Sequence, residues 1–285
     1  MPDTPLPHSV IQESVARALA EDVGPGDLSA AAVPAHAAGE AVIIARAPGV
    51  LCGQAFVAEV FAQLGGEVRV QWSTAEGAVL REDQEIAVLH GPAADLLTGE
   101  RTALNFLQTL SGTATAAAEL TERVEGTGVR IVDTRKTLPG LRTPQKYAVR
   151  VGGGHNHRHG LFDGVLLKEN HIAWAGSLAA AVSAARETAP HTARVQVEVE
   201  DLEELNQAVA AGVDSVLLDN FSLADLRTAV ADHAGHCFLE ASGNIGPDNV
   251  RAVAETGVHA ISSGTLTRDL TSLDLSMRFR GPHTG

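Results

Sequence analysis

Two kinds of hydrophobic pattern divide the chain. In its first hundred residues, apolar positions at helical spacing over 10–20 are followed by three short β-like runs, at 41–47, 67–73 and 85–90, with turn residues between them. Residues 99–125 are rich in Ala and Leu, contain no proline and have helical spacing. The pattern predicts a small α+β unit that ends in a long helix.

A second pattern begins near residue 129, where short apolar runs alternate with helical segments. The runs are continuous, which is typical of strands covered on both faces of a parallel sheet. They occupy 129–133, 163–168, 194–199, 214–219, 237–240 and 260–264. This repeated order of strand and helix predicts an α/β barrel, incomplete compared with the usual eight strands. An open doubly wound sheet is the competing architecture.

Polar residues end these apolar runs in a regular way. In a barrel the carboxyl ends of the strands converge on one mouth, where active sites are built. The residues concerned are Lys168, Glu198, Asp219, Glu240 and Ser263. We treat them as site candidates, except for Glu240, to which we assign a structural role.

The charge of the chain is unevenly distributed. Its 285 residues contain 21 Lys and Arg against 35 Asp and Glu, a formal charge of -14, which argues against a general nucleic-acid or anionic-membrane binder. All three lysines, Lys136, Lys146 and Lys168, fall within 133–168, where four arginines and two acids make the segment formally +5. A solvated basic face is the alternative, but the cations are interleaved with glycines, a proline and strand ends. We therefore predict a polyanionic substrate.

Other features bound the class of protein. No apolar run is long enough to span a bilayer, and the first ten residues lack the pattern of a secretory signal. Cys52 and Cys237 lie far apart in apolar contexts, so we expect free thiols and a cytoplasmic protein that binds no membrane.

The histidines and carboxylates leave several kinds of chemistry open. His155, His157 and His159 alternate, so they could bind a metal, donate to an anionic substrate or serve a structural role, and the adjacent Arg158 disfavours zinc. Glu198 and Asp219 could hold Mg²⁺, stabilise a cationic carbon or pair with Lys168 and Arg158. The turns at 242–244 and 262–264 offer backbone N–H groups to a phosphate.

Sequence blocks over residues 10–275 resemble one family in order. They include ERTALNF, DTRKTLPGLR, GGGHNHRHGL, DGVLLKENH, VEVE, VLLDN, EASGNI and ISSGTLT. The combination is specific, and it resembles quinolinate phosphoribosyltransferases. The resemblance implies an N-terminal α/β sandwich over 1–110, an α/β barrel over 111–275 and a tail over 276–285. A sheet shared by the N-terminal segment and residues near the C-terminus is an open alternative, and we expect 278–285 to be frayed.

The resemblance also implies an activity. The family joins quinolinate to phosphoribosyl pyrophosphate, giving nicotinate mononucleotide, pyrophosphate and CO2 in NAD biosynthesis, with Mg²⁺. Its members form homodimers in which each subunit covers the partner's active site, and the sequence leaves a hexamer open. Both substrates carry several negative charges, which agrees with the cation-rich segment at 133–168.

Roles carry over by motif. The resemblance implies that Arg135, His157 and Arg158 hold the quinolinate carboxylates, with Lys168 nearby and Arg101 reaching the partner's site. Lys136 would contact the pyrophosphate or the ribosyl donor, while Glu198 and Asp219 would bind ribose hydroxyls and Mg²⁺. We count Lys136, Lys168, Glu198 and Asp219 as catalytic. The remaining substrate-binding candidates are Thr134, Ser242, Gly243, Asn244, Ser263 and Gly264.

Some alternatives remain. GDLSA and SSGTLT depart from the family's commoner forms, and the second puts the fine geometry of a phosphate turn in doubt. Lys168 at a strand end could instead form a Schiff base, as in an aldolase. A molybdenum-transport-associated homologue of the same family and a non-catalytic anion-binding protein are the other readings.

Overall fold

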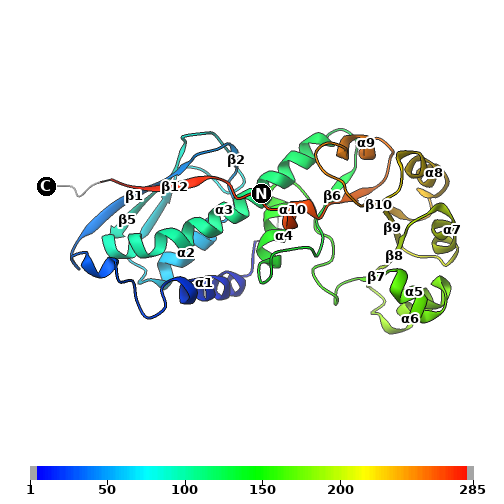
Figure 1. The fold of residues 1–285 in the computed structure, drawn as a ribbon, viewed down its shortest axis with the longest axis horizontal. Helices are drawn as coiled ribbons and strands as arrows, with labels where there is room; N and C mark the ends of the chain where they lie inside the picture. Colours follow the sequence, from blue (N-terminus) through cyan, green and yellow to red (C-terminus); the bar gives the residue numbers. More distant parts are fainter. Residues whose placement is uncertain (1–4, 281–285) are drawn as a thin grey trace. The chain divides into compact units, whose positions relative to one another are not determined.

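The computed structural model describes residues 5–280 and divides them into two compact units (Figure 1). The N-terminal unit takes in residues 5–118, 138–153 and 270–280, and the parallel-sheet unit takes in 119–137 and 154–269. Each unit therefore contains segments that are far apart in the sequence.

An antiparallel sheet forms the centre of the N-terminal unit. Its strand order is β12-β1-β5-β3, with β1 at Ala38–Ala45, β3 at Arg69–Trp72, β5 at Glu85–Pro92 and β12 at Leu275–Arg280. The predicted runs at 41–47, 67–73 and 85–90 are confirmed as β1, β3 and β5. A two-stranded sheet joins β2 (Gly49–Val50) to β4 (Val79–Leu80).

Helices and one hydrophobic core complete this unit. They are α1 (His8–Asp22), a 3-10 turn η1 (Ala30–Ala32), α2 (Gln54–Gln63), α3 (Ala93–Arg123) and α4 (Arg142–Val151). The core joins Val15 of α1, Ile43 of β1, Phe56 of α2 and Leu107 of α3, all fully buried. Burial of such side chains stabilises the unit by about 1.5–3 kcal/mol each.

Six parallel strands form the second unit. They are β6 (Arg130–Val132), β7 (Val165–Leu167), β8 (Val195–Val199), β9 (Ser215–Asp219), β10 (Phe238–Ser242) and β11 (Ala260–Ser262). All six predicted runs are thereby confirmed. The strand order is β6-β11-β10-β9-β8-β7, so the first strand of the unit lies beside the last. From β7 to β11 each strand pairs with the next in the sequence, and β11 then pairs with β6. A doubly wound sheet would reverse direction at one strand. The observed order is therefore that of an incomplete barrel with β6 and β7 at its edges.

Helices follow the strands of this sheet from β7 onward. They are α5 (Glu169–Ala175), α6 (Leu178–Thr188), α7 (Leu202–Ala210), α8 (Leu223–His233), α9 (Val250–Ala254) and α10 (Thr265–Arg268). α7 packs on β8 and β9, α8 on β10 and α9 on β11 (Figure 1). Ser177, Asp201 and Ser222 cap α6, α7 and α8, each accepting a hydrogen bond from a backbone N–H three residues later.

The C-terminal segment differs from the expected frayed tail. Residues 275–280 form β12, which pairs with β1 from Ala45↔Leu275 to Glu40↔Arg280, so the sheet does include residues near the C-terminus. Arg280 also donates to Glu40 at 2.7 Å and to Glu85 at 2.9 Å. Leu275 and Met277 are buried, and this alternation is the signal that identifies the strand. Residues 281–285 lie outside the described residues.

The predicted domain boundary at residue 110 stays a prediction, because the two compact units do not follow the order of the chain. α3 runs unbroken through residue 110, and the segment 138–153 belongs to the N-terminal unit. The reason is close packing, because a Cβ at Gly152 would lie 2.2 Å from the carbonyl oxygen of Ala114 in α3. Ala148 of α4 is fully buried in the same core.

Substitution of Gly112 tests how closely the backbone before β12 packs against α3. A Cβ at Gly112 would lie 2.2 Å from the carbonyl oxygen of Thr271, just before the backbone bond from Leu273 N–H to the Gln108 oxygen. Alanine is intrinsically the better helix residue by about 1 kcal/mol, but here the clash is with backbone. We therefore expect Gly112→Ala to destabilise the protein by about 1–3 kcal/mol in denaturant unfolding.

Gly235→Ala is the matched control. A Cβ at Gly235 would meet no atom within 4 Å, so we expect a change of less than about 0.5 kcal/mol. Equal stability of the two variants would show that the 271–272 backbone moves aside freely.

Candidate active site

The carboxyl ends of the parallel strands surround a cavity of about 390 Å³. Every strand of the sheet contributes to its lining, either with its last residues or with the segment that follows it. The predicted site residues that line it are Thr134, Arg135, Lys136, His157, Arg158, Lys168, Glu198, Asp219 and Ser242. Residues separated by more than a hundred positions are thus brought together, as expected for a barrel mouth.

A second cavity of about 220 Å³ adjoins the first. The two share Thr134, Lys136, Asp219, Ser242 and Ser262. The second also contains the predicted residues of the two turns, Gly243, Asn244, Ser263 and Gly264. The site therefore consists of two connected compartments, with Lys136 in the lining of both.

The turns in the second cavity are held by backbone geometry that few residues adopt. Gly243 has φ 97°, and Asn220 and Asn244 have φ 56° and 50°. A Cβ at Gly243 would lie 2.3 Å from Asn220 Oδ1, so glycine is required there. Asn220 N–H donates to the Ser242 carbonyl at 2.9 Å, and Ser263 Oγ donates to the Ile245 carbonyl at 2.7 Å. Three successive strand-end loops are tied together in this way.

Positive charge is crowded in the first cavity. Burial, and after it the charge of Arg135, lowers the pKa of Arg158, while Asp163 acts in the opposite direction. Arg158 is oriented by a hydrogen bond from its guanidinium to the Gly164 carbonyl at 3.0 Å. Two arginines that repel one another would be stabilised by an anionic ligand between them.

The carboxylates of the mouth lie against these cations. Lys168 Nζ donates to Glu198 Oε2 in an ion pair. Burial, and then the charge of Glu198, raises the pKa of Asp219, and this is opposed by Lys168, Lys136 and a 2.8 Å hydrogen bond from Asn220. Of the pairings that the sequence left open for the two carboxylates, that of Glu198 with Lys168 is present.

A polar network lies beneath the mouth. His157 Nε2 is 2.9 Å from Gln196 Oε1 and 3.6 Å from Glu240 Oε2, and Gln196 Nε2 donates to Glu240 Oε2 at 2.9 Å. On the other side of His157, Asp133 Oδ1 accepts from its backbone N–H at 2.9 Å. Sequence reasoning did not identify Gln196, which lies two residues before Glu198 and so on the same face of its strand.

Two buried oxygens in the lining have no hydrogen-bond partner among residues 5–280. They are Glu240 Oε1 and Ser262 Oγ, in residues that are 4% and 3% exposed. Buried polar atoms without a partner are unfavourable, so they point to a ligand or ordered water in this cavity.

Other candidates lie outside these cavities. Arg101 is exposed on α3 in the N-terminal unit and lines neither cavity. Lys146 is fully buried in α4 of the same unit. His155 continues the sheet through a bridge to Val132, and His159 lies 3.7 Å from Asp163, so these two histidines have structural contacts.

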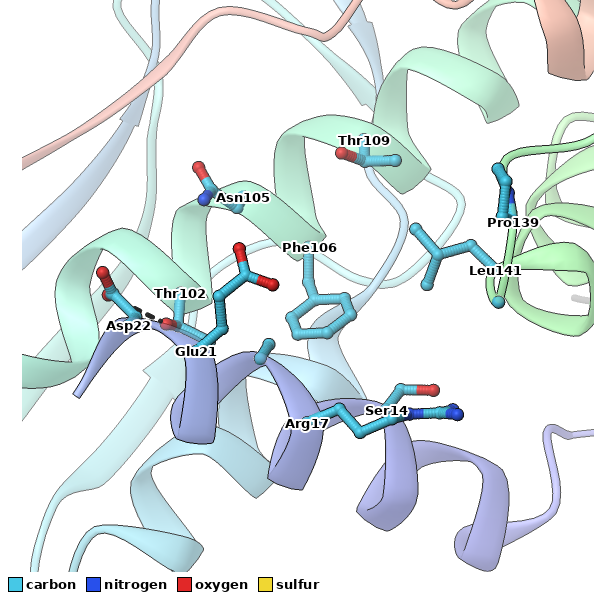
Figure 2. A pocket seen from close by; sticks show the side chains of 12 residues that line it. Ser14, Arg17, Glu21, Asp22, Thr102, Asn105, Phe106, Thr109, Pro139 and Leu141 are labelled. Carbon is cyan, nitrogen blue, oxygen red and sulfur yellow. Dashed lines mark hydrogen bonds between the residues drawn. The ribbon is translucent and has the colours of Figure 1, made fainter. Parts of the chain in front are cut away.

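A third cavity, of about 410 Å³, lies in the N-terminal unit. It is bounded by α1, α3 and the segment before α4, and Figure 2 shows Phe106 and Asn105 opposite Arg17 and Glu21. In its lining Arg17 is outnumbered by the acids Glu21 and Asp22, and Asp22 already accepts from Thr102 at 3.3 Å. This lining disfavours an anionic substrate, so the mouth of the parallel sheet is the better candidate.

The two cysteines are free, Cys52 buried and Cys237 half-buried, as predicted. Among residues 5–280, no helix combines the length and the apolar content that crossing a bilayer requires.

The raised pKa of Asp219 predicts that this carboxylate weakens the fold at neutral pH. A carboxyl group whose folded-state pKa exceeds its ordinary value of 3.8 stabilises the fold most when protonated, and that contribution is lost as the pH rises through the folded-state pKa. We expect Asp219→Asn to raise Tm at about pH 7 and the gain to shrink as the pH falls toward about 4.

Thermal melts at the two pH values measure this effect. Asp248→Asn, which changes an exposed carboxylate outside both cavities, should leave Tm unchanged. A Tm at neutral pH that falls in Asp219→Asn would contradict the prediction.

Known proteins match this arrangement. The family model for the quinolinate phosphoribosyl transferase N-terminal domain matches residues 27–111, and that for its C-terminal domain matches residues 113–278. The solved structure of the nicotinate-nucleotide pyrophosphorylase from Francisella tularensis superposes with a TM-score of 0.93 at 43% identity, over 97% of this chain and 98% of that one.

Curated relatives agree over nearly the whole length. A Bacillus subtilis protein named "Probable nicotinate-nucleotide pyrophosphorylase (carboxylating)" is 43% identical over 257 residues, 90% of this chain and 89% of that protein. The human nicotinate-nucleotide pyrophosphorylase (carboxylating) is 40% identical over 278 residues, 96% of this chain and 93% of that protein. Because both family models and these relatives match most of the chain, it belongs to the quinolinate phosphoribosyltransferase family, a family of decarboxylating pentosyltransferases.

Proposed function

We propose that the two connected cavities transfer a phosphoribosyl group from phosphoribosyl pyrophosphate to quinolinate, with loss of CO2. The products, nicotinate mononucleotide and pyrophosphate, place the reaction in NAD biosynthesis. The observation that carries this proposal is the crowding of Arg135 and Arg158 in a cavity that also contains Lys136 and Lys168. Such a cavity favours a ligand with several anionic groups.

Quinolinate occupies the first cavity in this proposal. Its two carboxylates are bound by Arg135 and Arg158, with His157, Thr134 and Lys168 in the same lining. Arginine binds carboxylates through two parallel N–H groups, so the pair also orients the pyridine ring.

The ribosyl donor extends from the first cavity into the second. Backbone N–H groups of the turns at Ser242–Asn244 and Ser263–Gly264 bind the 5′-phosphate. Lys136, which lines both cavities and whose Cδ would lie 3.1 Å from a Cβ at Gly264, contacts the pyrophosphate. Glu198 and Asp219 bind the ribose hydroxyls between these two points.

Glu198 and Asp219 also fit Mg²⁺. They line the same cavity, and after burial the charge of Glu198 is the main cause of the raised pKa of Asp219, so the two carboxylates lie close together. Residues 5–280 contain no group of three or more His, Cys, Asp or Glu side chains that could hold a metal. Two carboxylates suit Mg²⁺, which keeps several waters and takes substrate phosphate oxygens as further ligands. Bound there, the ion would neutralise charge on the pyrophosphate.

The chemistry follows from this placement. The pyridine nitrogen attacks ribose C1 while the bond from C1 to the pyrophosphate oxygen breaks. Glu198 and Asp219 stabilise the oxocarbenium-like transition state, and Lys136 stabilises the negative charge on the leaving group. The 2-carboxylate then leaves as CO2, and the quaternised nitrogen stabilises the electron pair left on C2 until a proton replaces it. No covalent nucleophile is required, and the ion pair with Glu198 engages the Lys168 amine that a Schiff base would need.

We propose a homodimer with shared active sites. Arg101 is exposed on α3 and belongs to the matching ERTALNF block, which supports a role in the partner's site. A hexamer built from such dimers is compatible with this role. The free thiols support a cytoplasmic location.

The direct test is to incubate the protein with quinolinate, phosphoribosyl pyrophosphate and Mg²⁺ and to measure nicotinate mononucleotide and CO2. Arg158→Ala removes a charge-assisted contact worth about 1.5–3 kcal/mol, so we expect KM for quinolinate to rise by roughly tenfold to a hundredfold. Arg227→Ala, at an exposed position on α8, should leave KM unchanged.

Two results would overturn the proposal. Binding of the substrates without turnover would indicate an anion-binding protein. Reductive trapping of a carbonyl substrate on Lys168 would indicate an aldolase.

The shared site predicts complementation between two inactive variants. Arg101→Ala and Lys168→Ala should each be inactive alone. In an equal mixture half of the dimers are hybrids, and each hybrid has one intact site, so we expect recovery of about a quarter of the parental activity. Absence of recovery in hybrids demonstrated by differential tagging would exclude the shared site.

A further inference from the structure

The floor of the first cavity contains a buried carboxylate that the proposed reaction does not use. Glu240 lies on β10, two residues before Ser242, and is 4% exposed. Its Oε2 accepts from Gln196 Nε2 at 2.9 Å, and its Oε1 has no hydrogen-bond partner among the described residues. Glu240 is therefore connected to the rest of the site through Gln196.

The Glu240 carboxylate determines which way the Gln196 amide faces. A carboxylate accepts hydrogen bonds, so the Gln196 NH2 group turns toward it and Oε1 turns away. Gln196 Oε1 then lies 2.9 Å from His157 Nε2, and an oxygen acceptor at that position requires the hydrogen of the ring on Nε2. Since Gln196 is 6% exposed, water does not compete readily for these contacts.

The tautomer of His157 in turn affects Arg158. With the hydrogen on Nε2, Nδ1 of the neutral ring accepts, and it accepts from the backbone N–H of Arg158 at 2.7 Å. Asp133, fully buried, fixes the same segment by accepting from the backbone N–H of His157 at 2.9 Å and from Asn156 Nδ2 at 2.6 Å. The backbone that carries Arg158 is thus held from both sides.

We propose that Glu240 is a positioning residue for quinolinate binding. It acts through Gln196 and the Nε2–H tautomer of His157 to hold Arg158 in the orientation that receives a substrate carboxylate. The quinolinate part of this inference rests on the proposed function, whereas the tautomer part stands on the contacts of the chain alone.

The test is Glu240→Gln, which keeps the shape of the side chain and offers Gln196 a donor as well as an acceptor. The Gln196 amide can then turn over, so we expect 15N NMR of histidine-labelled protein to show His157 losing its uniform Nε2–H form. The His157 signal is assigned by its absence in His157→Gln. We expect KM for quinolinate to rise about tenfold, while kcat and KM for phosphoribosyl pyrophosphate change less than about twofold.

A double variant tests the order of the contacts. In Gln196→Glu combined with Glu240→Gln, the carboxylate lies next to His157 and the amide lies beneath it. The carboxylate can accept from both His157 Nε2–H and the new amide, so we expect the Nε2–H tautomer and the parental KM for quinolinate to return. Rescue by this exchange would not follow from a role in packing alone.

Glu59→Gln is the matched control. Glu59 is a buried glutamate, 8% exposed, that also accepts from a glutamine amide, Gln63 Nε2 at 2.7 Å, but in the N-terminal unit. We expect the His157 signal and both KM values to remain those of the parent.

The outcomes separate this inference from the proposed function. An unchanged His157 tautomer in Glu240→Gln, or an equal rise in both KM values, would overturn the inference. Should Glu240→Gln fail to fold, loss of the Nε2–H form in the folded double variant would also overturn it. A parent protein that shows the expected tautomer but does not turn over quinolinate would overturn the proposed function and leave the contact chain supported.

Discussion

The site depends on one constraint, the cyclic order of the parallel strands. Because β11 lies between β10 and β6, the loop after β6 adjoins the loops after β10 and β11. Lys136 can therefore line the same cavity as Ser242, Gly243 and Gly264. The strand order of a doubly wound sheet would separate these loops. Lys136 and the turns could then not bind the same substrate together.

The charged side chains of the first cavity destabilise the fold to some extent. Arg158 is half-buried near Arg135, and Asp219 is half-buried near Glu198, so two pairs of like charges line the cavity. The ion pair of Lys168 with Glu198 compensates part of this repulsion. A folded protein tolerates such unfavourable pairs where a ligand with complementary charge binds, which is a common compromise between stability and function.

The local pattern of apolar and polar residues predicts most helices and strands, but it does not predict α4 and β12. The continuous apolar runs of β8 and β9 and the periodicity of α7 were sufficient to predict those elements. The pattern does not predict α4, because its cations lie in the segment interpreted as anion-binding, whereas Lys146 is buried and the helix belongs to the N-terminal unit. The pattern does not predict β12, because chain ends are commonly frayed, whereas Leu275 and Met277 pack in the core.

Sequence by itself determined the residue types of the site, since motifs such as DTRKT and GGGHNHR specify the cations, and strand-end positions specify the carboxylates. Tertiary structure alone decided which of them meet. It placed Lys136 and Lys168 at one mouth and Lys146 in another unit, and it connected Glu240 to His157 through Gln196. The physical reason is that the local pattern encodes which face of a strand is buried, whereas the neighbours across a barrel depend on strand order and register, which long-range packing sets.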